Sequence, residues 1–391
     1  MPTLSPIADR AEALTAFFRD LHAHPELGFQ ETRTAARVAE ALRAAGVDEI
    51  HEEIGGTGIV AVIRGKGQGN RRIGLRADMD ALPILEASGV DYASQTPGTM
   101  HACGHDGHTT MLLGAAEYLA ATREFDGTAV LIFQPAEEGL GGARRMIDEG
   151  LFERFPVDEA YGLHNTPDGQ VNRVGLTKGA AMAGAAFFDI AITGRGSHAA
   201  QPQHARDALV IAATLVGQLQ TIVARNVPPL DTCVLSVTQS HAGSAYNVVP
   251  ETATLAGTIR YFRPEVLELA ETRMRTLCEG LALAYGVTIE VDIRNAFDVL
   301  MNDPGLSDAY LDAARDVVGA DLVHDGDPPM TGSEDFADML QVVPGAYLRL
   351  GHAGTVPLHH PGFVLDPDCL PVGASILARI VERRLPLREA A

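Results

Sequence analysis

The sequence has few cysteines and a shortage of positive charge, and both features exclude classes of protein. Its cysteines, Cys103, Cys233, Cys278 and Cys369, lie far apart and form no CxxC pair, which favours reduced thiols over a disulfide framework. The chain carries 30 basic and 51 acidic residues, for a formal net charge of −21, and this excess disfavours binding to phosphate backbones and to anionic membranes. We therefore predict a cytoplasmic protein that does not bind nucleic acid.

Long apolar runs are also missing. No stretch reaches the roughly 18 uninterrupted apolar residues typical of a membrane-spanning helix. The N-terminus lacks a basic start followed by an apolar segment, so it does not resemble a secretory leader. We expect neither secretion nor a membrane partner.

The short motifs of several enzyme classes are absent. His51-Glu52 is not followed by the second histidine of an HExxH motif, and Lys66 in "RGKGQG" lacks the Ser or Thr of a phosphate-binding loop. The segment "GGTGIVAV" lacks the third glycine of a dinucleotide fingerprint, and no GxSxG elbow occurs. Nucleotide, nicotinamide and serine-hydrolase chemistries therefore have no support from the sequence.

The order of predicted elements indicates an α/β domain interrupted by an insertion. Strands are expected at 58–65, 72–78, 127–134 and 159–165, with a helix from about Gly107. Near residue 183 the pattern changes to strand, helix, two strands, helix, strand, which is typical of a small α+β domain. A length of 391 residues also exceeds the usual size of one core. We predict an α/β domain from 1–183 and 296–391, interrupted by a smaller inserted domain, the satellite domain, at 184–295.

The segment "MHACGHDGHTTM" concentrates metal-binding side chains just before the predicted helix. Cys103 and His105 are two residues apart, where irregular backbone can direct both toward one point. Thiolate and imidazole suit zinc, manganese, cobalt or nickel. The alternative is a helix N-terminal turn with polar caps and an inert thiol.

Further donors follow the ends of other predicted strands. "QPAEEGLGG" places Glu137 and Glu138 after one strand, and His164 lies at the end of another, where open α/β sheets bind ligands. Adjacent carboxylates point different ways, so one can ligate an ion while the other transfers a proton. Taken alone, a Glu-Glu pair is usually a solvated turn and a lone strand-end histidine is usually structural. Together with "LHHPGF", however, these donors are enough for two ions sharing a water.

The ordered motifs resemble a known enzyme family. "LHAHPELGFQETRTA", "RADMDALPI", "HACGHDGHTTMLLGAA", "FQPAEEGLGGARRMI", "YGLHN", "GRGSHAAQP", "NVVPETATLAGTIR", "TGSEDFA" and "LHHPGF" are similar to the aminoacylase/carboxypeptidase metallohydrolases. They resemble in particular the amidohydrolase branch, which contains hippurate hydrolases and plant indole-3-acetyl-amino-acid hydrolases. The resemblance runs from about residue 11 to residue 385. It is specific for fold and reaction type and much less so for substrate.

Carried over position by position, the resemblance implies a role for each motif. It implies two divalent ions, Mn²⁺ or Zn²⁺ foremost and Co²⁺ or Ni²⁺ as alternatives, held by Cys103, His105, Glu138, His164 and His359. The "Leu-His-x-Pro" pattern selects His359 over His360. Glu137 is the implied general base and acid, and the carboxylates of Asp80 and Asp106 would orient ligand imidazoles or cap turns.

The resemblance also assigns residues of the inserted domain. His198 would stabilise the oxyanion, in some relatives from a partner subunit, and Asn247 and Arg260 would bind the substrate's α-carboxylate. The alternatives without a role in catalysis are a surface loop for His198 and a strand-edge salt bridge for Arg260. Many relatives have a histidine directly after "HAAQP", whereas this chain has Gln203 followed by His204. This difference does not affect any of the implied metal ligands.

The sequence therefore predicts a metallo-amidohydrolase that cleaves the amide bond of N-acyl amino acids or similar small conjugates by a metal-bound hydroxide. The expected partners are the small-molecule substrate and, through the satellite domain, a second copy of the chain. Two alternatives stay open. One is a dipeptidase or carboxypeptidase acting on free peptides, and the other is a non-catalytic metal-dependent binding protein, which would be expected to lose Glu137 or a ligand.

Overall fold

The computed structural model describes residues 3–387, and the chain forms two compact units. Among these residues the first unit comprises 3–181, Met301–Pro328 and 335–387, and the second comprises Met182–Leu300 and Pro329–Glu334. The mixed α/β architecture is therefore a larger α/β unit interrupted by a smaller satellite unit, as expected. The sequence predicts an insertion at 184–295. In the structure the second unit also includes a short segment from much later in the chain.

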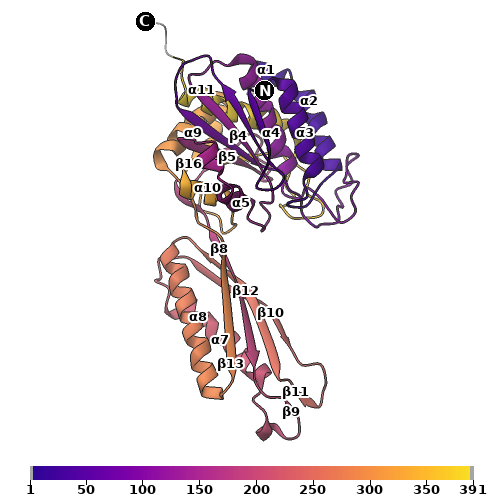
Figure 1. Ribbon diagram of the computed structural model, residues 1–391, viewed down its shortest axis with the longest axis vertical. Coiled ribbons are helices and arrows are strands. Elements are labelled where there is room, and N and C mark those ends of the chain that lie inside the picture. The colour runs from indigo at the N-terminus through magenta and orange to yellow at the C-terminus, as the bar shows by residue number, and fades with distance from the viewer. Residues whose placement is uncertain (1–2, 388–391) are drawn as a thin grey trace. The chain divides into compact units, whose positions relative to one another are not determined.

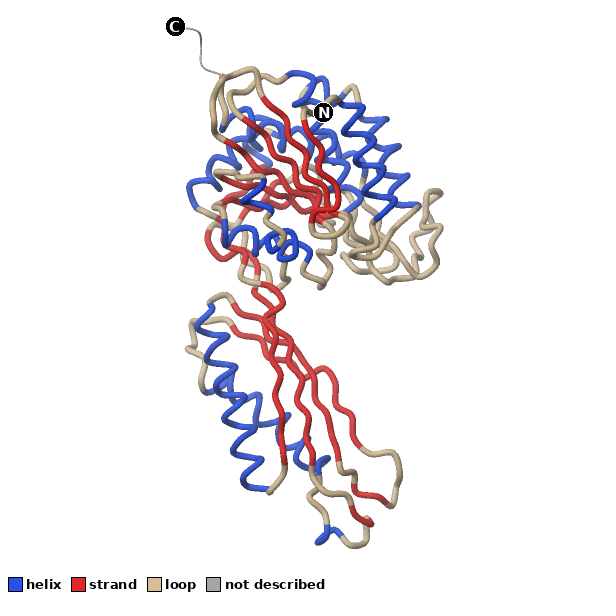
Figure 2. Tube along the Cα trace, viewed as in Figure 1, coloured by secondary structure: helices blue, strands red, loops and turns tan. Residues whose placement is uncertain are grey.

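An eight-stranded sheet forms the middle layer of the first unit (Figures 1 and 2). Its strands, in spatial order, are β1 (Glu49–Ile54), β2 (Gly58–Arg64), β4 (Thr128–Gln134), β3 (Arg72–Asp78), β5 (Glu159–Thr166), β16 (Gly345–Gly351), β6 (Val174–Leu176) and β15 (Val323–Asp325). Strands β4, β3, β5 and β16 are parallel to one another. Because parallel strands end at the same edge of a sheet, the residues that follow them gather there.

Helices cover both faces of this sheet. The helices of the unit are α1 (Ser5–Ala8), α2 (Ala11–Ala23), α3 (Thr32–Ala45), α4 (His105–Thr122), α5 (Gly142–Asp148), α6 (Leu151–Arg154), α9 (Pro304–Val318), α10 (Phe336–Val342) and α11 (Leu370–Arg384), with the short 3₁₀ turns η2 (Ala320–Leu322) and η3 (Pro367–Cys369). Helices α4 and α11 pack against each other and over β3 and β5, whereas α5 and α10 contact β4 and β5.

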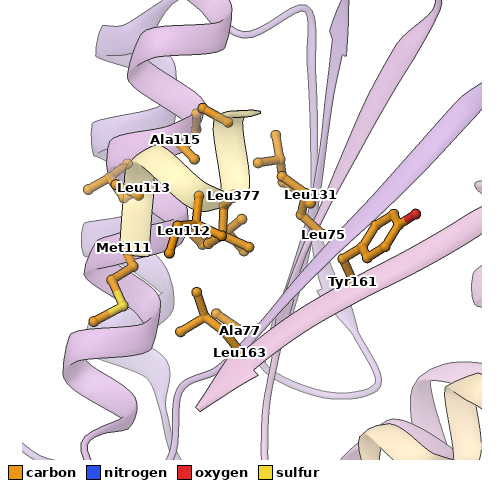
Figure 3. Close-up of a cluster of buried hydrophobic side chains, with 14 of the residues drawn as sticks. Leu75, Ala77, Met111, Leu112, Leu113, Ala115, Leu131, Tyr161, Leu163 and Leu377 are labelled. Atoms are coloured by element: carbon orange, nitrogen blue, oxygen red, sulfur yellow. The ribbon is translucent and has the colours of Figure 1, made fainter. Parts of the chain in front are cut away.

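The main core lies between the sheet and the layer that contains α4 and α11. Figure 3 shows Leu112 of α4 and Leu377 of α11 between the helix layer and Leu75 and Leu131 of neighbouring strands. All of these side chains are at most 1% exposed. The strands alternate, so their other side chains face the α5 and α10 layer. The apolar core therefore holds the sheet and α4 in fixed relation, and the strand ends and the start of α4 are positioned by the same packing.

The second unit has a four-stranded antiparallel sheet with two long helices on one side (Figure 1). The sheet order is β10 (Cys233–Ala242), β12 (Thr252–Tyr261), β8 (Gly184–Thr193) and β13 (Thr288–Phe297), and the helices are α7 (Ala208–Arg225) and α8 (Pro264–Tyr285). Two short strands, β9 (Ser197–His198) and β11 (Val248–Val249), pair separately, η1 (Pro202–His204) follows β9, and β7 (Gly179–Met182) pairs with β14 (Leu300–Asn302).

One helix among residues 3–387 meets the length and composition of a membrane span. Helix α7 has a mean hydropathy of 1.5, and 33% of its residues are buried inside the structure. Its buried side chains, including Ile211, Leu215 and Leu219, form one stripe, and the helix contacts β10, β12 and α8. A single helix with one side packed on a sheet is weak evidence for a membrane span.

The sequence-based elements agree with the structure, apart from the start of one helix. The four strands expected in the first unit are β2, β3, β4 and β5, and the expected order of strand, helix, two strands, helix, strand describes β8, α7, β10, β12, α8 and β13. Helix α4 begins at His105 rather than near Gly107. Gly104 precedes it with φ of +86°, a left-handed conformation that glycine adopts without strain. His105 therefore lies in the first helical turn and not in irregular backbone.

Candidate metal centre

The carboxyl ends of three parallel strands position most of the candidate site. Strand β3 ends at Asp78, two residues before Asp80. Strand β4 ends three residues before Glu137, and His164 lies near the end of β5. Cys103 and His105 join them from the start of α4.

The structure brings the five sequence-predicted ligands into one cluster. The ligand atoms of Cys103, His105 and His164 lie within 4.8 Å of one another, and so do those of Cys103, Glu138 and His359. Cys103 Sγ is 3.4 Å from His164 Nε2, and His359 Nε2 is 3.1 Å from Glu138 Oε1. These two groups of donors share the Cys103 thiol.

Two buried atoms at the centre of this cluster lack the contacts that buried polar atoms require. His105 Nε2 has no hydrogen-bond partner, and Glu138 Oε1 has only the close contact with His359 Nε2, which lacks hydrogen-bond geometry; the two atoms are 4.0 Å apart. An unsatisfied buried acceptor costs about 1–3 kcal/mol. A divalent cation between them would satisfy both lone pairs, so the residues present fit a metal ion.

The ring orientations of two histidines suit the same role. His164 Nδ1 donates to the backbone oxygen of Asn165 at 2.6 Å, which leaves Nε2 with a lone pair facing Cys103. His105 Nδ1 lies 3.3 Å from Asp80 Oδ1, which directs Nε2 to the centre of the cluster. Metal-binding histidines commonly donate their other ring N–H in this way.

Asp80 joins the imidazole of His105 to the glutamate turn. Its two carboxylate oxygens accept the backbone N–H groups of Glu137 and Glu138, each at 3.0 Å. Of the two roles expected for Asp80, orienting an imidazole and capping a turn, the structure shows both. One buried carboxylate thus sets the position of a candidate ligand and of the turn that carries two more functional groups.

The backbone is strained at two points in the cluster. Ala136, directly before the glutamates, has φ of +54°, and His359 has φ of +62°. Left-handed conformations in residues other than glycine cost on the order of 1–3 kcal/mol and concentrate at functional sites. The strain at Ala136 is held by tight packing, because Gly142 donates to its carbonyl oxygen at 3.0 Å and a Cβ at Gly142 would lie 1.7 Å from the oxygen of Pro135.

Comparison with known proteins identifies the family. The model of peptidase family M20/M25/M40 matches residues 74–383, a span that contains every residue of the cluster. The chain belongs to this family.

Named relatives cover nearly the whole chain. The chain is 40% identical over 365 residues to a hippurate hydrolase of Campylobacter jejuni, covering 93% of this chain and 94% of the relative. It is 38% identical over 363 residues to an N-acetylcysteine deacetylase of Bacillus subtilis, covering 93% and 94%. These similarities confirm the resemblance found in the sequence.

Two solved structures share the fold. A putative aminohydrolase from methicillin-resistant Staphylococcus aureus superposes with a TM-score of 0.89 at 33% identity, covering 97% of this chain and 98% of the other. The YXEP protein of Bacillus subtilis, described as a dinuclear metal binding peptidase of the M20 family, gives 0.84 at 34% identity, covering 97% and 99%.

In this M20-family chain, a buried network behind the ligands was not found by sequence reasoning. Asn165 donates its side-chain N–H to the carbonyl oxygen of Cys103 at 2.6 Å, and its backbone N–H to His108 Nε2 at 2.9 Å. His108 Nδ1 therefore carries the proton, and it faces Asp78 Oδ1 at 2.7 Å. The buried guanidinium of Arg76 pairs with Asp78 at 2.8 Å. The motifs "RADMD" and "YGLHN" contained three of these residues, but no sequence signal paired them.

The same network explains why residue 104 is glycine. A Cβ at Gly104 would lie 2.4 Å from Asn165 Nδ2, so any side chain there would displace the amide that links Cys103 to β5. Gly104 is thus required both by its positive φ and by this close approach.

The cluster is rich in acidic side chains, and Arg76 supplies a positive charge. Asp78 is fully buried; although burial alone would raise its pKa, its electrostatic interactions with His105, His108 and Arg76 hold that pKa well below the usual range. Burial raises the pKa of the Cys103 thiol to about 12. Asp80 and Glu137 add two more buried carboxyl groups, 1% and 7% exposed. A bound cation would relieve both the excess of acidic groups and the cost of forming a thiolate.

Asp106 does not orient a candidate ligand. Its carboxylate contacts His22 Nδ1 at 2.7 Å and accepts the N–H of Gly107 at 2.8 Å. His22 Nε2 in turn lies 3.2 Å from Glu86 Oε1. Two roles are expected for Asp106, and the described contacts show one of them, the capping of a turn. The imidazole that its carboxylate contacts belongs to His22 on α2 and not to a candidate ligand.

This His22 contact predicts a pH dependence of stability. Burial lowers the pKa of His22, but its bonds to Asp106 and Glu86 outweigh burial and raise that pKa from 6.5 to about 9. Because the folded-state pKa is raised, the stabilisation is complete below about pH 6.5 and is lost as pH rises toward 9. We expect the urea midpoint of the wild type to fall over this window and that of His22→Gln to fall less. A His24→Gln variant, at the end of the same helix, serves as control; equal slopes for wild type and His22→Gln would refute this assignment.

The remaining predicted residues belong to the second unit. His198 lies on β9, Asn247 directly precedes β11, and Arg260 lies on β12. His198 and Val248 are paired in register. The part these three residues play toward the metal cluster of the first unit stays a prediction.

Proposed function

We propose that this chain is a metal-dependent amidohydrolase that releases the amino acid from N-acyl amino acids. The observation that carries the proposal is the position of Glu137. Its carboxylate lies within 4.8 Å of the ligand atoms of His105 and Glu138, beside the two unsatisfied atoms that fit a cation. The names of the relatives, a hippurate hydrolase and an N-acetylcysteine deacetylase, support this substrate class.

The proposed mechanism divides the work between the two adjacent glutamates. Bound divalent ions would polarise the amide carbonyl and acidify the attacking water. Glu138 would hold an ion, with Cys103 common to both donor groups. Glu137 takes the proton from the water and delivers it to the departing amine, because an amine leaves readily only when protonated. Asp80 keeps both glutamates in place through their backbone N–H groups.

The second unit would supply substrate contacts. His198 Nδ1 accepts the N–H of Ala200 at 3.1 Å, so Nε2 carries the proton that an oxyanion needs. Arg260 is half-buried, and burial lowers its pKa. Its guanidinium contacts Thr258 and the oxygen of Ile259, and no carboxylate pairs with it among residues 3–387. A guanidinium without a counterion suits a substrate α-carboxylate, which Asn247 would also contact.

Three finer points belong to the same proposal. The Cys/His/Glu donor set supports Mn²⁺ or Zn²⁺, with Co²⁺ or Ni²⁺ as alternatives. The exposed side of α7, with Leu209 and Val210 at 44% and 49% exposure, supports association of two copies through the satellite domain. Four free, buried cysteines support a reducing, cytoplasmic location.

A metal-reload panel tests the proposal. Protein stripped with a chelator is reloaded separately with Mn²⁺, Zn²⁺, Co²⁺ or Ni²⁺ and offered acetyl-, benzoyl- and indoleacetyl-amino acids beside free dipeptides. We expect no hydrolysis by the stripped protein and restored amine release from acylated substrates only. Release from dipeptides alone would make the chain a peptidase, and no release with any ion would favour a non-catalytic binding protein.

A further inference from the structure

A second cavity lies on the first unit, away from the ends of the strands that carry the metal cluster. It has a volume of about 460 Å³ and is lined by residues of β1, β2, β3, β4 and α6. Its residues Arg72 and Thr128 are the first residues of β3 and β4, whereas the metal cluster follows the last residues of these strands. Seven-residue strands at about 3.3 Å per residue separate the two places by roughly 20 Å. The cavity is therefore distinct from the proposed catalytic site.

Strand register gathers polar donors along one wall of this cavity. Arg64 of β2 and Arg72 of β3 are both paired with Thr128 of the strand between them. Residues paired across strands point to the same face of a sheet, and neighbouring strands are about 4.8 Å apart. The two guanidinium groups and the threonine hydroxyl thus form one row that an oxyanion can span.

A third arginine approaches from the opposite wall. Arg154 of α6 lies over the ring of Phe155, with its guanidinium carbon 5.2 Å from the ring centroid. His51 packs against the same ring, 4.7 Å between centroids. Phe155 is only 6% exposed. Its ring is a fixed apolar support that both the Arg154 guanidinium and the His51 imidazole contact.

The positive charge of the cavity is only partly neutralised. Glu49 is the one acidic residue in its lining, and it pairs with Arg64 and His51. Arg72 and Arg154 form no ion pair with any of the residues 3–387; the carboxylate at the rim, Asp158, accepts the backbone N–H of Arg72. Two arginines without an ion pair in one cavity are notable in a chain of net charge −21, whose overall field repels anions from most of the surface.

We propose that this cavity binds a small phosphate-type dianion. Guanidinium groups match the geometry of phosphate oxygens through paired charge-assisted hydrogen bonds, and Thr128 adds a neutral donor to the row. The walls are too polar for an apolar ligand. The site is independent of amide hydrolysis, so its occupation does not require the catalytic proposal to hold.

Titration calorimetry with inorganic phosphate tests this site in the metal-loaded, full-length protein. We expect saturable binding of one phosphate per chain, weakened about tenfold in Arg72→Gln and further in the Arg72→Gln/Arg154→Gln double variant. Arg225→Gln, which removes an exposed arginine at the end of α7, is the matched control and should bind as the wild type does. Succinate at equal ionic strength should bind more weakly, because its carboxylates are spaced differently from phosphate oxygens.

A second readout separates loss of the site from loss of the fold. Phosphate should raise the unfolding temperature of the wild type and of Arg225→Gln, but not that of the double variant. In the absence of phosphate, the double variant and the wild type should unfold at the same temperature. Binding that persists in the double variant would place the anion elsewhere, for example at the metal centre. That result, the absence of saturable binding, or equal binding of succinate would each overturn the proposal.

Discussion

Replacing Glu137 with glutamine is expected to abolish turnover while leaving metal content unchanged. Glutamine keeps the shape of the side chain and both backbone contacts of the turn, but it cannot accept a proton from water. Loss of a general base typically costs about 10²–10⁴-fold in rate, so kcat should fall by that amount. The measurement pairs steady-state hydrolysis of a benzoyl- or acetyl-amino acid with metal analysis of the purified protein.

The neighbouring glutamate provides the matched control. Glu138→Gln makes the same exchange of a carboxylate for an amide, one residue further along the same turn. It removes a carboxylate whose Oε1 is buried without a hydrogen-bond partner and lies 3.1 Å from His359 Nε2. We expect this variant to lose metal, with activity partly recovered at high metal concentration. Full turnover by Glu137→Gln would rule out Glu137 as the base, and loss of metal from that variant would make it a ligand instead.

Apart from His359, which only the resemblance selected, the candidate ligands and Glu137 could be found in the sequence because each lies beside a recognisable feature. Glu137, Glu138 and His164 follow predicted strand ends, and Cys103 and His105 precede a predicted helix. Elements of this kind are set by local hydrophobic periodicity, which a single sequence records. The resemblance then ordered these donors into a single set.

The supporting network could not be predicted in the same way, since its contacts depend on tertiary packing. His108 and Asn165 meet across 57 positions of the chain, and Arg76 reaches Asp335 across 259. Nothing in the local sequence distinguishes Asp78, which contacts His108, from Asp80, which contacts His105. The histidine that each aspartate contacts is determined by the register of β3 and by the packing of α4 against it.

The second unit shows a different limit of sequence reasoning. The sequence predicts a strand around Arg260 but a loop at His198, which the structure places on β9, and the proposed work of both residues depends on substrate bound at the first unit. Arg260 is informative even so, because a half-buried guanidinium without a carboxylate partner among the described residues is costly to maintain for structure alone. Its lack of a counterion is a property of the folded sheet that the motif "GTIRYF" does not reveal.

Substitution of Asp80 by alanine is expected to weaken metal binding more than it weakens the fold. The variant loses the contact with His105 and both acceptors for the glutamate turn. Removal of a carboxylate that orients a metal-binding histidine typically costs 10–100-fold in affinity. Competition with a chromogenic chelator measures the affinity, and urea unfolding of the metal-free protein measures stability. Asp80→Asn retains one acceptor oxygen and should give an intermediate affinity.

Asp303→Ala distinguishes this effect from the general cost of deleting a carboxylate that accepts backbone N–H groups. Asp303 caps α9 by accepting the N–H of Leu306 at 2.9 Å and has no part in the cluster. Its loss should lower the free energy of unfolding by about 1 kcal/mol with metal affinity unchanged. If Asp80→Ala behaved like Asp303→Ala, less stable but equally tight for metal, the carboxylate of Asp80 would be a turn cap and not the group that orients His105.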